Sequence, residues 1–169
     1  GAEVVLMQVL GSTHSHFIYV GYKNNDMLEK GRQLFRSCKE SAKMIAKLNM
    51  YSEPSAYVSR LGEQSLEVGD WTTDNHFMKF DFNVALGKAS VYANEWTKMM
   101  NSLEQTNSAG LITHRAGSGW MSHFVYVGGN SIDDLYSTFD ANSQTDAFQT
   151  FIKNVSSIRE LRNVSLISP

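Results

Sequence analysis

Histidine offers the widest choice of chemistry in this sequence, because its ring can bind a metal or transfer a proton near neutral pH. Five histidines occur, and His16, His76 and His123 each precede a phenylalanine at the start of an apolar stretch. Such an imidazole could ligate a metal or a haem iron if a carboxylate or carbonyl oriented its second nitrogen. His14 and His16 could chelate together, since they share one face of a strand. The alternative is that these histidines hydrogen-bond to the adjacent turn. We favour this alternative, and we expect no bound metal and no cofactor.

Other catalytic signatures are missing from the 169 residues. The sequence has no Gly-x-Ser-x-Gly, no P-loop and no dinucleotide-binding fingerprint, and Gly117-Ser118-Gly119 is typical of a turn. The single cysteine, Cys38, excludes a disulfide or a cysteine-built zinc site within this sequence. It falls on the apolar side of the first predicted helix, so we expect it to be a small buried filler rather than a nucleophile. A formal charge of −2 gives no electrostatic basis for binding nucleic acid, so we expect no such partner.

The ends and the hydropathy of the sequence bear on its location. No apolar run approaches the ~20 residues of a membrane-spanning helix, so we expect no membrane span. The sequence opens Gly1-Ala2-Glu3 without methionine, as an exported protein does once its signal peptide has been removed. We therefore expect a periplasmic or secreted protein, and a cytoplasmic location is the alternative.

A basic stripe occurs at helical spacing between residues 32 and 47. Its members follow one another at intervals of three and four: Arg32, Arg36, Lys39, Lys43 and Lys47. An anionic partner or a membrane surface would fit such a stripe. Glu29 and Glu40 partly neutralise it, so we favour the interpretation as a solvent-exposed helix face.

The strongest pattern is an internal repeat. The segment His16–Gly21, HFIYVG, recurs as His123–Gly128, HFVYVG, with one conservative difference. Flanking residues match as well, among them Asp26 with Asp133. A match of this length indicates duplication of a supersecondary unit; two unrelated strands of similar composition are the alternative.

Each copy predicts the element order β-β-α-β. In the first copy we expect strands at 4–10, 16–22 and 57–61, with one helix running to about Asn49 before the third strand. A short extra strand could occupy 66–71. In the second copy we expect strands at 111–115, 123–128 and 161–167, with a helix that is interrupted near Asn142.

An alternating strand at 76–82 and an amphipathic helix separate the two copies. The helix has apolar residues at intervals of four and three: Ala85, Ala89, Tyr92, Trp96, Met99 and Leu103. Together with the second copy they make β-α-β-β-α-β, the order of a complete ferredoxin-like unit. We therefore predict an α+β protein of two ferredoxin-like halves, 2–72 and 73–169, whose antiparallel sheets could close into an α/β barrel. The first half lacks the leading strand and helix: either the sheet is one element short, or that element was lost with the true N-terminus.

This tandem of units resembles the dimeric α/β barrel superfamily, which includes antibiotic-biosynthesis-monooxygenase-like, stress-responsive barrel and NIPSNAP-like proteins. The resemblance covers residues 4–168 and rests on element order and duplication, not on a catalytic motif. If the protein is an enzyme, the resemblance implies cofactor-free oxygenase-type or haem-related chemistry in a cavity lined by aromatic residues. The residue types for such a lining are present, with packing in the core as the alternative: Tyr19, Trp71, Asn75, His76, Trp96, Trp120 and Tyr126.

These observations lead to two candidate functions. The first is binding of a small apolar or aromatic molecule in the barrel or at its mouth. Its predicted ligand-binding residues are His16, Tyr19, His76, His123 and Tyr126. The alternative is a non-enzymatic interaction or assembly module, whose apolar sheet faces would pair into homo-oligomers. The sequence identifies no catalytic residue.

Overall fold

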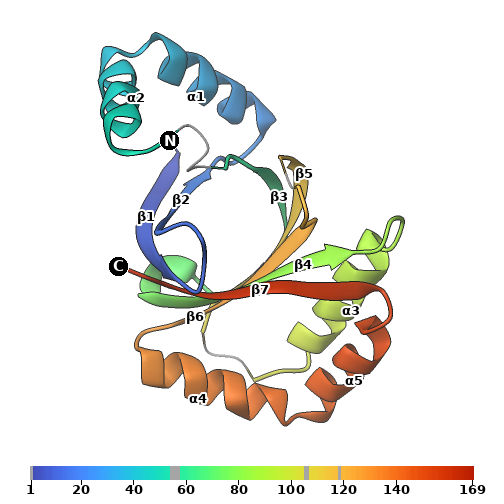
Figure 1. Ribbon diagram of the computed structural model, residues 1–169. Coiled ribbons are helices and arrows are strands. Elements are labelled where there is room, and N and C mark those ends of the chain that lie inside the picture. Colours follow the sequence, from blue (N-terminus) through green and yellow to red (C-terminus); the bar gives the residue numbers. More distant parts are fainter. Residues whose placement is uncertain (1, 54–57, 105–106, 118) are drawn as a thin grey trace.

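One curved antiparallel sheet organises the chain. The computed structural model describes residues 2–53, 58–104, 107–117 and 119–169. Within them, seven strands pair in the order β2-β1-β7-β4-β6-β5-β3. Their bounds are β1 Glu3–Leu10, β2 His16–Gly21, β3 Leu61–Val68, β4 His76–Val84, β5 Ala109–Ala116, β6 His123–Gly129 and β7 Arg159–Ser168. The α+β class and the antiparallel sheet predicted from the sequence are confirmed, and the sheet curls without closing (Figure 1).

Residues 76–168, here the C-terminal unit, form a complete ferredoxin-like arrangement. Their strands lie in the order β7-β4-β6-β5, each antiparallel to its neighbour. Three helices cover one face of these strands: α3 Ala89–Met100, α4 Ile132–Ser143 and α5 Asp146–Val155 (Figure 1). The predicted interruption near Asn142 is confirmed, because the Thr145 hydroxyl accepts the N–H of Phe148 and starts α5 afresh.

The hydrophobic core lies between that sheet face and the helices α3 and α5. Tyr92 and Trp96 of α3 are 0% and 1% exposed and pack with Phe151 of α5, as the three- and four-residue spacing of the predicted stripe requires. The buried Tyr92 hydroxyl accepts a hydrogen bond from Arg159 Nη1 (3.1 Å). The guanidinium of Arg159 also lies 4.3 Å from the ring centroid of Phe82, so it bridges the sheet and the helix layer.

The strands β1, β2 and β3, here with their helices the N-terminal unit (residues 3–68), are divided between the two edges of the sheet. β1 pairs with β7 and carries β2 beyond it, whereas β3 pairs with β5 on the opposite side. Helices α1 Asn25–Ser37 and α2 Lys39–Tyr51 pack on each other, on the side of the molecule away from α3, α4 and α5 (Figure 1). The predicted halves 2–72 and 73–169 share this one sheet, so the boundary between them stays a prediction.

The single helix predicted to reach Asn49 is wrong. Cys38 has an extended backbone (φ −82°, ψ 129°) and separates α1 from α2. The Ser37 hydroxyl donates to the backbone carbonyls of Gln33 and Leu34. These are carbonyls at the end of α1, which backbone N–H groups would bond in a continuous helix. Cys38 is therefore not a buried filler: it is half-buried at the junction, and its Sγ donates to Glu40 Oε2 at 3.1 Å.

The third strand of the N-terminal unit also differs from the prediction. It spans Leu61–Val68, so the expected strand at 57–61 and the optional strand at 66–71 are replaced by one strand between them. Residue 57 lies outside the described residues. Gly62 and the residues around it pair with β5 through register shifts, an irregularity that periodicity alone does not reveal.

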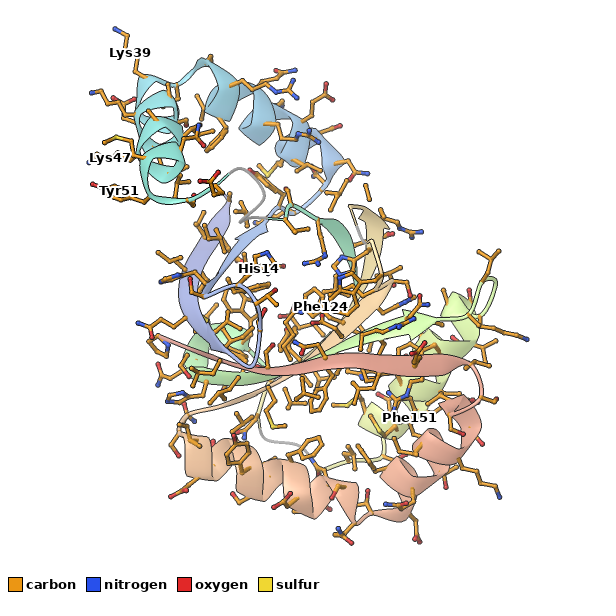
Figure 2. All side chains as sticks on the ribbon, in the orientation of Figure 1. His14, Lys39, Lys47, Tyr51, Phe124 and Phe151 are labelled. Carbon is orange, nitrogen blue, oxygen red and sulfur yellow. The ribbon has the colours of Figure 1, made fainter. Side chains whose placement is uncertain are left out.

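The basic stripe lies in solvent, as the favoured interpretation predicts. All five of its residues are exposed along α1 and α2, and Lys39 and Lys47 project away from the molecule in Figure 2. Among the described residues, no helix is both long enough and apolar enough to cross a lipid bilayer.

The depth of the core gives a test of the fold. Trp96→Ala should lower the free energy of unfolding by about 3–5 kcal/mol, because it removes a fully buried indole from between α3 and the sheet. Trp120→Ala is the matched control, since Trp120 is 51% exposed and should change stability by less than about 0.5 kcal/mol. Urea unfolding followed by circular dichroism measures both, and equal losses would contradict the assigned core.

Candidate functional site

The two copies of the repeat face each other across the inside of the curved sheet. Alternation along β2 and β6 places Phe17 with Tyr19, and Phe124 with Tyr126, on the inner face. The rings of Phe17 and Phe124 lie 6.4 Å apart and nearly perpendicular (83°), an edge-to-face contact. The duplicated sequence therefore supplies two opposed walls of one space, here called the lumen.

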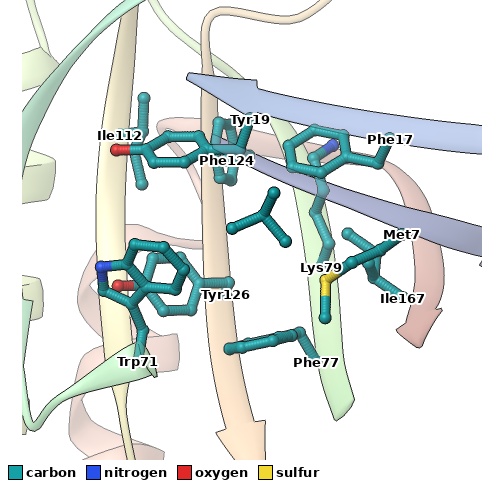
Figure 3. A pocket seen from close by; sticks show the side chains of 11 residues that line it. Met7, Phe17, Tyr19, Trp71, Phe77, Lys79, Ile112, Phe124, Tyr126 and Ile167 are labelled. Carbon is teal, nitrogen blue, oxygen red and sulfur yellow. The ribbon is translucent and has the colours of Figure 1, made fainter. Parts of the chain in front are cut away.

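Side chains from six strands (β1, β2, β4, β5, β6 and β7) and from the short helical turn Trp71–Thr73 line the lumen (Figure 3). The enclosed part of the cavity has a volume of about 60 Å³, and the space reaches about 570 Å³ when its open mouth is included. Its lining is almost wholly apolar or aromatic: Val5, Met7, Phe17, Tyr19, Trp71, Phe77, Lys79, Ile112, Phe124, Tyr126 and Ile167. Trp71 meets Tyr19 edge-on at 5.8 Å, and Phe77 meets Tyr126 at 5.9 Å, so the aromatic contacts continue around the wall.

Lys79 is the one cationic side chain in this lining. It projects from the middle of β4, is only 7% exposed, and its Nζ forms an ion pair with Asp81 Oδ1 on the same face of the strand. Nζ also lies 4.9 Å from the ring centroid of Phe124 and 5.9 Å from that of Phe17. Burial lowers the pKa of Lys79, and the attraction of Asp81 opposes that shift.

Further cationic and imidazole groups surround the Lys79–Asp81 pair. The ring of His114, on β5, lies 5.6 Å from that of Phe124, and burial lowers its pKa to about 4, with Arg60 and Lys79 adding to the effect. Neither ring nitrogen of His114, nor Nε of Arg60, has a hydrogen-bond partner within the described part of the chain. At neutral pH the cluster therefore holds an uncharged His114 and two cations against one carboxylate.

The opposite end of the lumen carries phenols and an acidic group. The Tyr126 hydroxyl donates to Glu67 Oε1 at 3.1 Å, and burial together with Glu67 raises the pKa of Tyr126 far above its ordinary value. Burial, followed by Glu67 and Glu3, also raises the pKa of Tyr19. Both phenols stay neutral at neutral pH, so the lumen runs from a basic end at Lys79 to a hydrogen-bonding end that carries two neutral phenols and the acidic residue Glu67.

Gly110 makes room for one of these phenols. A Cβ at this position would lie 2.2 Å from Cε1 of Tyr126, so only glycine lets the ring lie against β5.

The predicted site residues divide between the two faces of the sheet. Tyr19 and Tyr126 line the lumen, whereas His123 lies on the helix side, 3% exposed, with its ring 5.7 Å from that of Tyr92. His16 is exposed on the outer face of β2. His76 is half-buried at the start of β4, with its Nδ1 2.9 Å from Ser168 Oγ. These three histidines are not brought together.

The histidines at the starts of β2 and β6 make local hydrogen bonds, as expected if they contact the adjacent turn rather than a metal. Nδ1 of His16 lies 2.9 Å from Ser15 Oγ, and Nδ1 of His123 lies 2.8 Å from Ser122 Oγ, so the repeat conserves a serine–histidine contact. Within the described residues, no three or more His, Cys, Asp or Glu side chains are grouped so that they could hold a metal ion.

Sequence reasoning missed Lys79, Phe17 and Phe124. A signal was available for the phenylalanines, since the period of two in a strand puts Phe17 beside Tyr19 and puts His16 on the other face. For Lys79 and Asp81 the signal was weaker: a lysine and an acidic residue two apart among phenylalanines, in FMKFDF, indicate a charged pair on one face of an otherwise apolar strand.

Comparison with known proteins identifies the fold. No protein-family model matches the chain, and no curated protein matches its sequence. The structure of a candidate monooxygenase from Lactobacillus acidophilus NCFM matches with a TM-score of 0.60 and 9% identity, over 98% of this chain and 79% of the other. An anthrone oxidase-like protein matches with a TM-score of 0.59 and 11% identity, over 98% and 77%. The chain thus shares its ferredoxin-like α+β fold with these two structures, and at these identities the likeness shows the fold alone.

The buried His123 ring makes folding sensitive to acid. Burial lowers the pKa of His123 from 6.5 to about 4. Between pH 6.5 and pH 4, His123 therefore binds a proton in the unfolded chain and stays neutral in the folded chain. Stability is therefore lost as the pH falls from about 6.5 towards 4. His123→Gln should reduce by about 2 kcal/mol the stability that the protein loses between pH 7.5 and pH 4.5, measured by urea unfolding.

The repeat offers the matched control for this measurement. His16→Gln alters the exposed counterpart of His123 and should leave the pH dependence of unfolding as in the wild type. A His123→Gln variant with the wild-type pH dependence would show that the buried ring is not held neutral.

Proposed function

We propose that the protein binds a small, mainly aromatic molecule in the lumen, with an acidic group of that molecule directed at Lys79. The observation that carries the proposal is a buried lysine amine at one end of an otherwise aromatic cavity. Flat rings fit between walls of Phe and Tyr side chains, because edge-to-face and offset contacts are available on both sides.

The charges around the cavity support an anionic group on the ligand. Lys79 and Arg60 outnumber Asp81 at the basic end, and the buried nitrogens of Arg60 and His114 that have no hydrogen-bond partner among the described residues lie close to this pair. Glu67 at the opposite end would repel an anion and so fixes the orientation of the ligand. A carboxylate or an ionised phenol attached to a fused ring is the class of ligand that suits both ends.

The structural neighbours are compatible with this proposal. One is named as a candidate monooxygenase and the other as anthrone oxidase-like, and both share the fold of this chain. The proposal for the present chain extends to binding and includes no oxidation step.

Calorimetry with a pair of matched compounds tests the proposal. 2-Naphthoate carries the acidic group and 2-naphthylmethanol is its neutral analogue. The wild type should bind both and prefer the acid. The double variant Lys79→Met/Asp81→Leu removes the buried pair without leaving one charge unpaired. It should weaken binding of 2-naphthoate about tenfold or more, the value of one charged hydrogen bond, and change binding of the alcohol by less than about threefold.

A second ion pair supplies the control. Lys98→Met/Glu95→Leu removes a pair on the surface of α3, outside the lumen, and should leave both affinities unchanged. Binding of neither compound to the wild type, or the same loss of affinity in both double variants, would contradict the proposal.

The alternative function, an interaction module, is favoured by a different observation. Large apolar side chains are concentrated at the surface of the N-terminal unit, among them Val4, Leu6, Ile18, Leu34 and Phe35. This surface does not overlap the lumen, so the two functions are compatible.

A further inference from the structure

The burial of Lys79 sets it apart from every other lysine of the chain. It is 7% exposed and lines the lumen from the middle of β4, whereas the other eight lysines are all exposed. A buried amine can form an ion pair, transfer a proton or attack a carbonyl carbon. Ligand binding in the lumen uses the ion pair alone, and the surroundings of Nζ also suit the attack on a carbonyl.

The Lys79 ammonium has more hydrogen-bond donors than the lumen has acceptors for them. A protonated lysine carries three N–H groups. Among the described residues, Nζ donates to Oδ1 of Asp81 alone. Its other neighbours are the rings of Phe124 and Phe17, whose centroids lie 4.9 and 5.9 Å away, and Figure 3 shows the amine beside Phe17. The buried ammonium therefore has N–H groups that meet aromatic rings instead of an oxygen or nitrogen acceptor, which is a costly state for a buried charge.

A protonated imine on the same nitrogen matches these surroundings better than the ammonium does. It keeps the positive charge, so the carboxylate of Asp81 keeps its counter-ion, but it carries a single N–H group. Asp81 by itself can accept that one hydrogen bond. A flat aromatic group on the imine carbon would lie among the aromatic walls formed by Phe17, Phe124 and Tyr126.

The groups around Nζ also favour formation of the neutral amine that attacks. Burial lowers the pKa of Lys79; Asp81 opposes the shift, and the charge of Arg60 adds to it. Asp81 is a base in direct contact with Nζ, so the proton has an acceptor at hand. His114, whose ring lies 5.6 Å from that of Phe124, is uncharged at neutral pH and adds no further positive charge to the site.

We propose that Lys79 is a nucleophile that condenses with an aromatic aldehyde in the lumen to form an imine. The aldehyde carbon takes the place that the carboxylate carbon of an acidic ligand would occupy. This inference rests on the proposed binding of aromatic molecules in the same cavity, and it adds to that binding a covalent step and a second class of ligand.

The condensation balances without an oxidant or a reductant. Asp81 accepts a proton from the Lys79 ammonium, and the lone pair of the neutral amine forms a bond to the aldehyde carbon. The electron pair of the C=O bond moves to the oxygen, which takes the proton from Asp81. Asp81 then transfers a second proton from nitrogen to this oxygen, and water leaves as the nitrogen lone pair forms the C=N bond. An ammonium and an aldehyde thus become a protonated imine and one water, and Asp81 is again a carboxylate.

Reductive trapping on the wild-type protein tests the proposal. 2-Naphthaldehyde has the ring of the two calorimetric probes and carries an aldehyde in place of the acid. Cyanoborohydride converts an imine into a stable secondary amine, which peptide mapping by mass spectrometry assigns to a residue. At one equivalent of aldehyde Lys79 should carry most of the label, although eight exposed lysines compete for it. An excess of 2-naphthoate should prevent this labelling, because it occupies the same place. Label confined to exposed lysines would overturn the proposal.

Two lysine-to-arginine variants provide a second measurement and its matched control. Lys79→Arg keeps a cation beside Asp81, but a guanidinium forms no imine, so the total label at one equivalent should fall at least about fivefold. Lys98→Arg changes an exposed lysine that pairs with Glu95 on α3, and it should leave the labelling of Lys79 as in the wild type. Equal total labelling of the two variants would contradict the proposal. The wild-type map decides the question even if Lys79→Arg does not fold.

The imine and the proposed ligand binding can fail separately. Calorimetric binding of 2-naphthoate without label on Lys79 would overturn the imine and leave ligand binding in place. Label on Lys79 without binding of 2-naphthoate would support the nucleophile and overturn the preference for an acid. Absence of both binding and label would overturn both proposals.

Discussion

The alternation of strand direction is the constraint on which the rest of the structure depends. Seven antiparallel strands give a sheet whose two edges run in the same direction, so the sheet curls towards a barrel but has no favourable pairing with which to close it. The curvature creates the lumen, and no residue in the described ranges 2–53 and 58–63 of the N-terminal unit is buried. The same geometry therefore yields both an aromatic cavity and an uncovered apolar surface.

The duplicated segment is used in two ways by the two faces of the sheet. Its phenylalanine and tyrosine point inwards in both copies, and the equivalent residues Phe17 and Phe124 contact each other across the lumen. Its histidine points outwards, and the surroundings differ: His123 is buried under Tyr92, whereas His16 is exposed. The two copies of the repeated segment therefore differ in the burial of their histidines. The reason is that, among the described residues, a helix such as α3 covers the outer face of β6 but not that of β2.

The lumen combines two kinds of interaction that are usually separated in a protein. Aromatic walls provide a large apolar area for a flat ligand, and the buried Lys79–Asp81 pair provides a strong electrostatic feature with little solvent to screen it. Burial of such a pair is costly for folding unless close geometry and further hydrogen bonds offset the desolvation of both charges. The acidic aromatic ligand that we propose would bring a second anionic group to Lys79.

The sequence by itself determined the repeat, most of the element types and three aromatic residues of the lumen wall, Tyr19, Trp71 and Tyr126. Alternation in HFIYVG and HFVYVG predicted β2 and β6, and the spacing of Tyr92 and Trp96 predicted the buried face of α3, because local periodicity encodes these elements. Only the tertiary structure decided that the three strand-start histidines lie outside the lumen, that Lys79 lies inside it, and that Cys38 ends a helix. The physical reason is that periodicity divides a strand into two faces but does not say which face becomes the cavity; that choice depends on the direction in which the sheet curls and on where the helices pack.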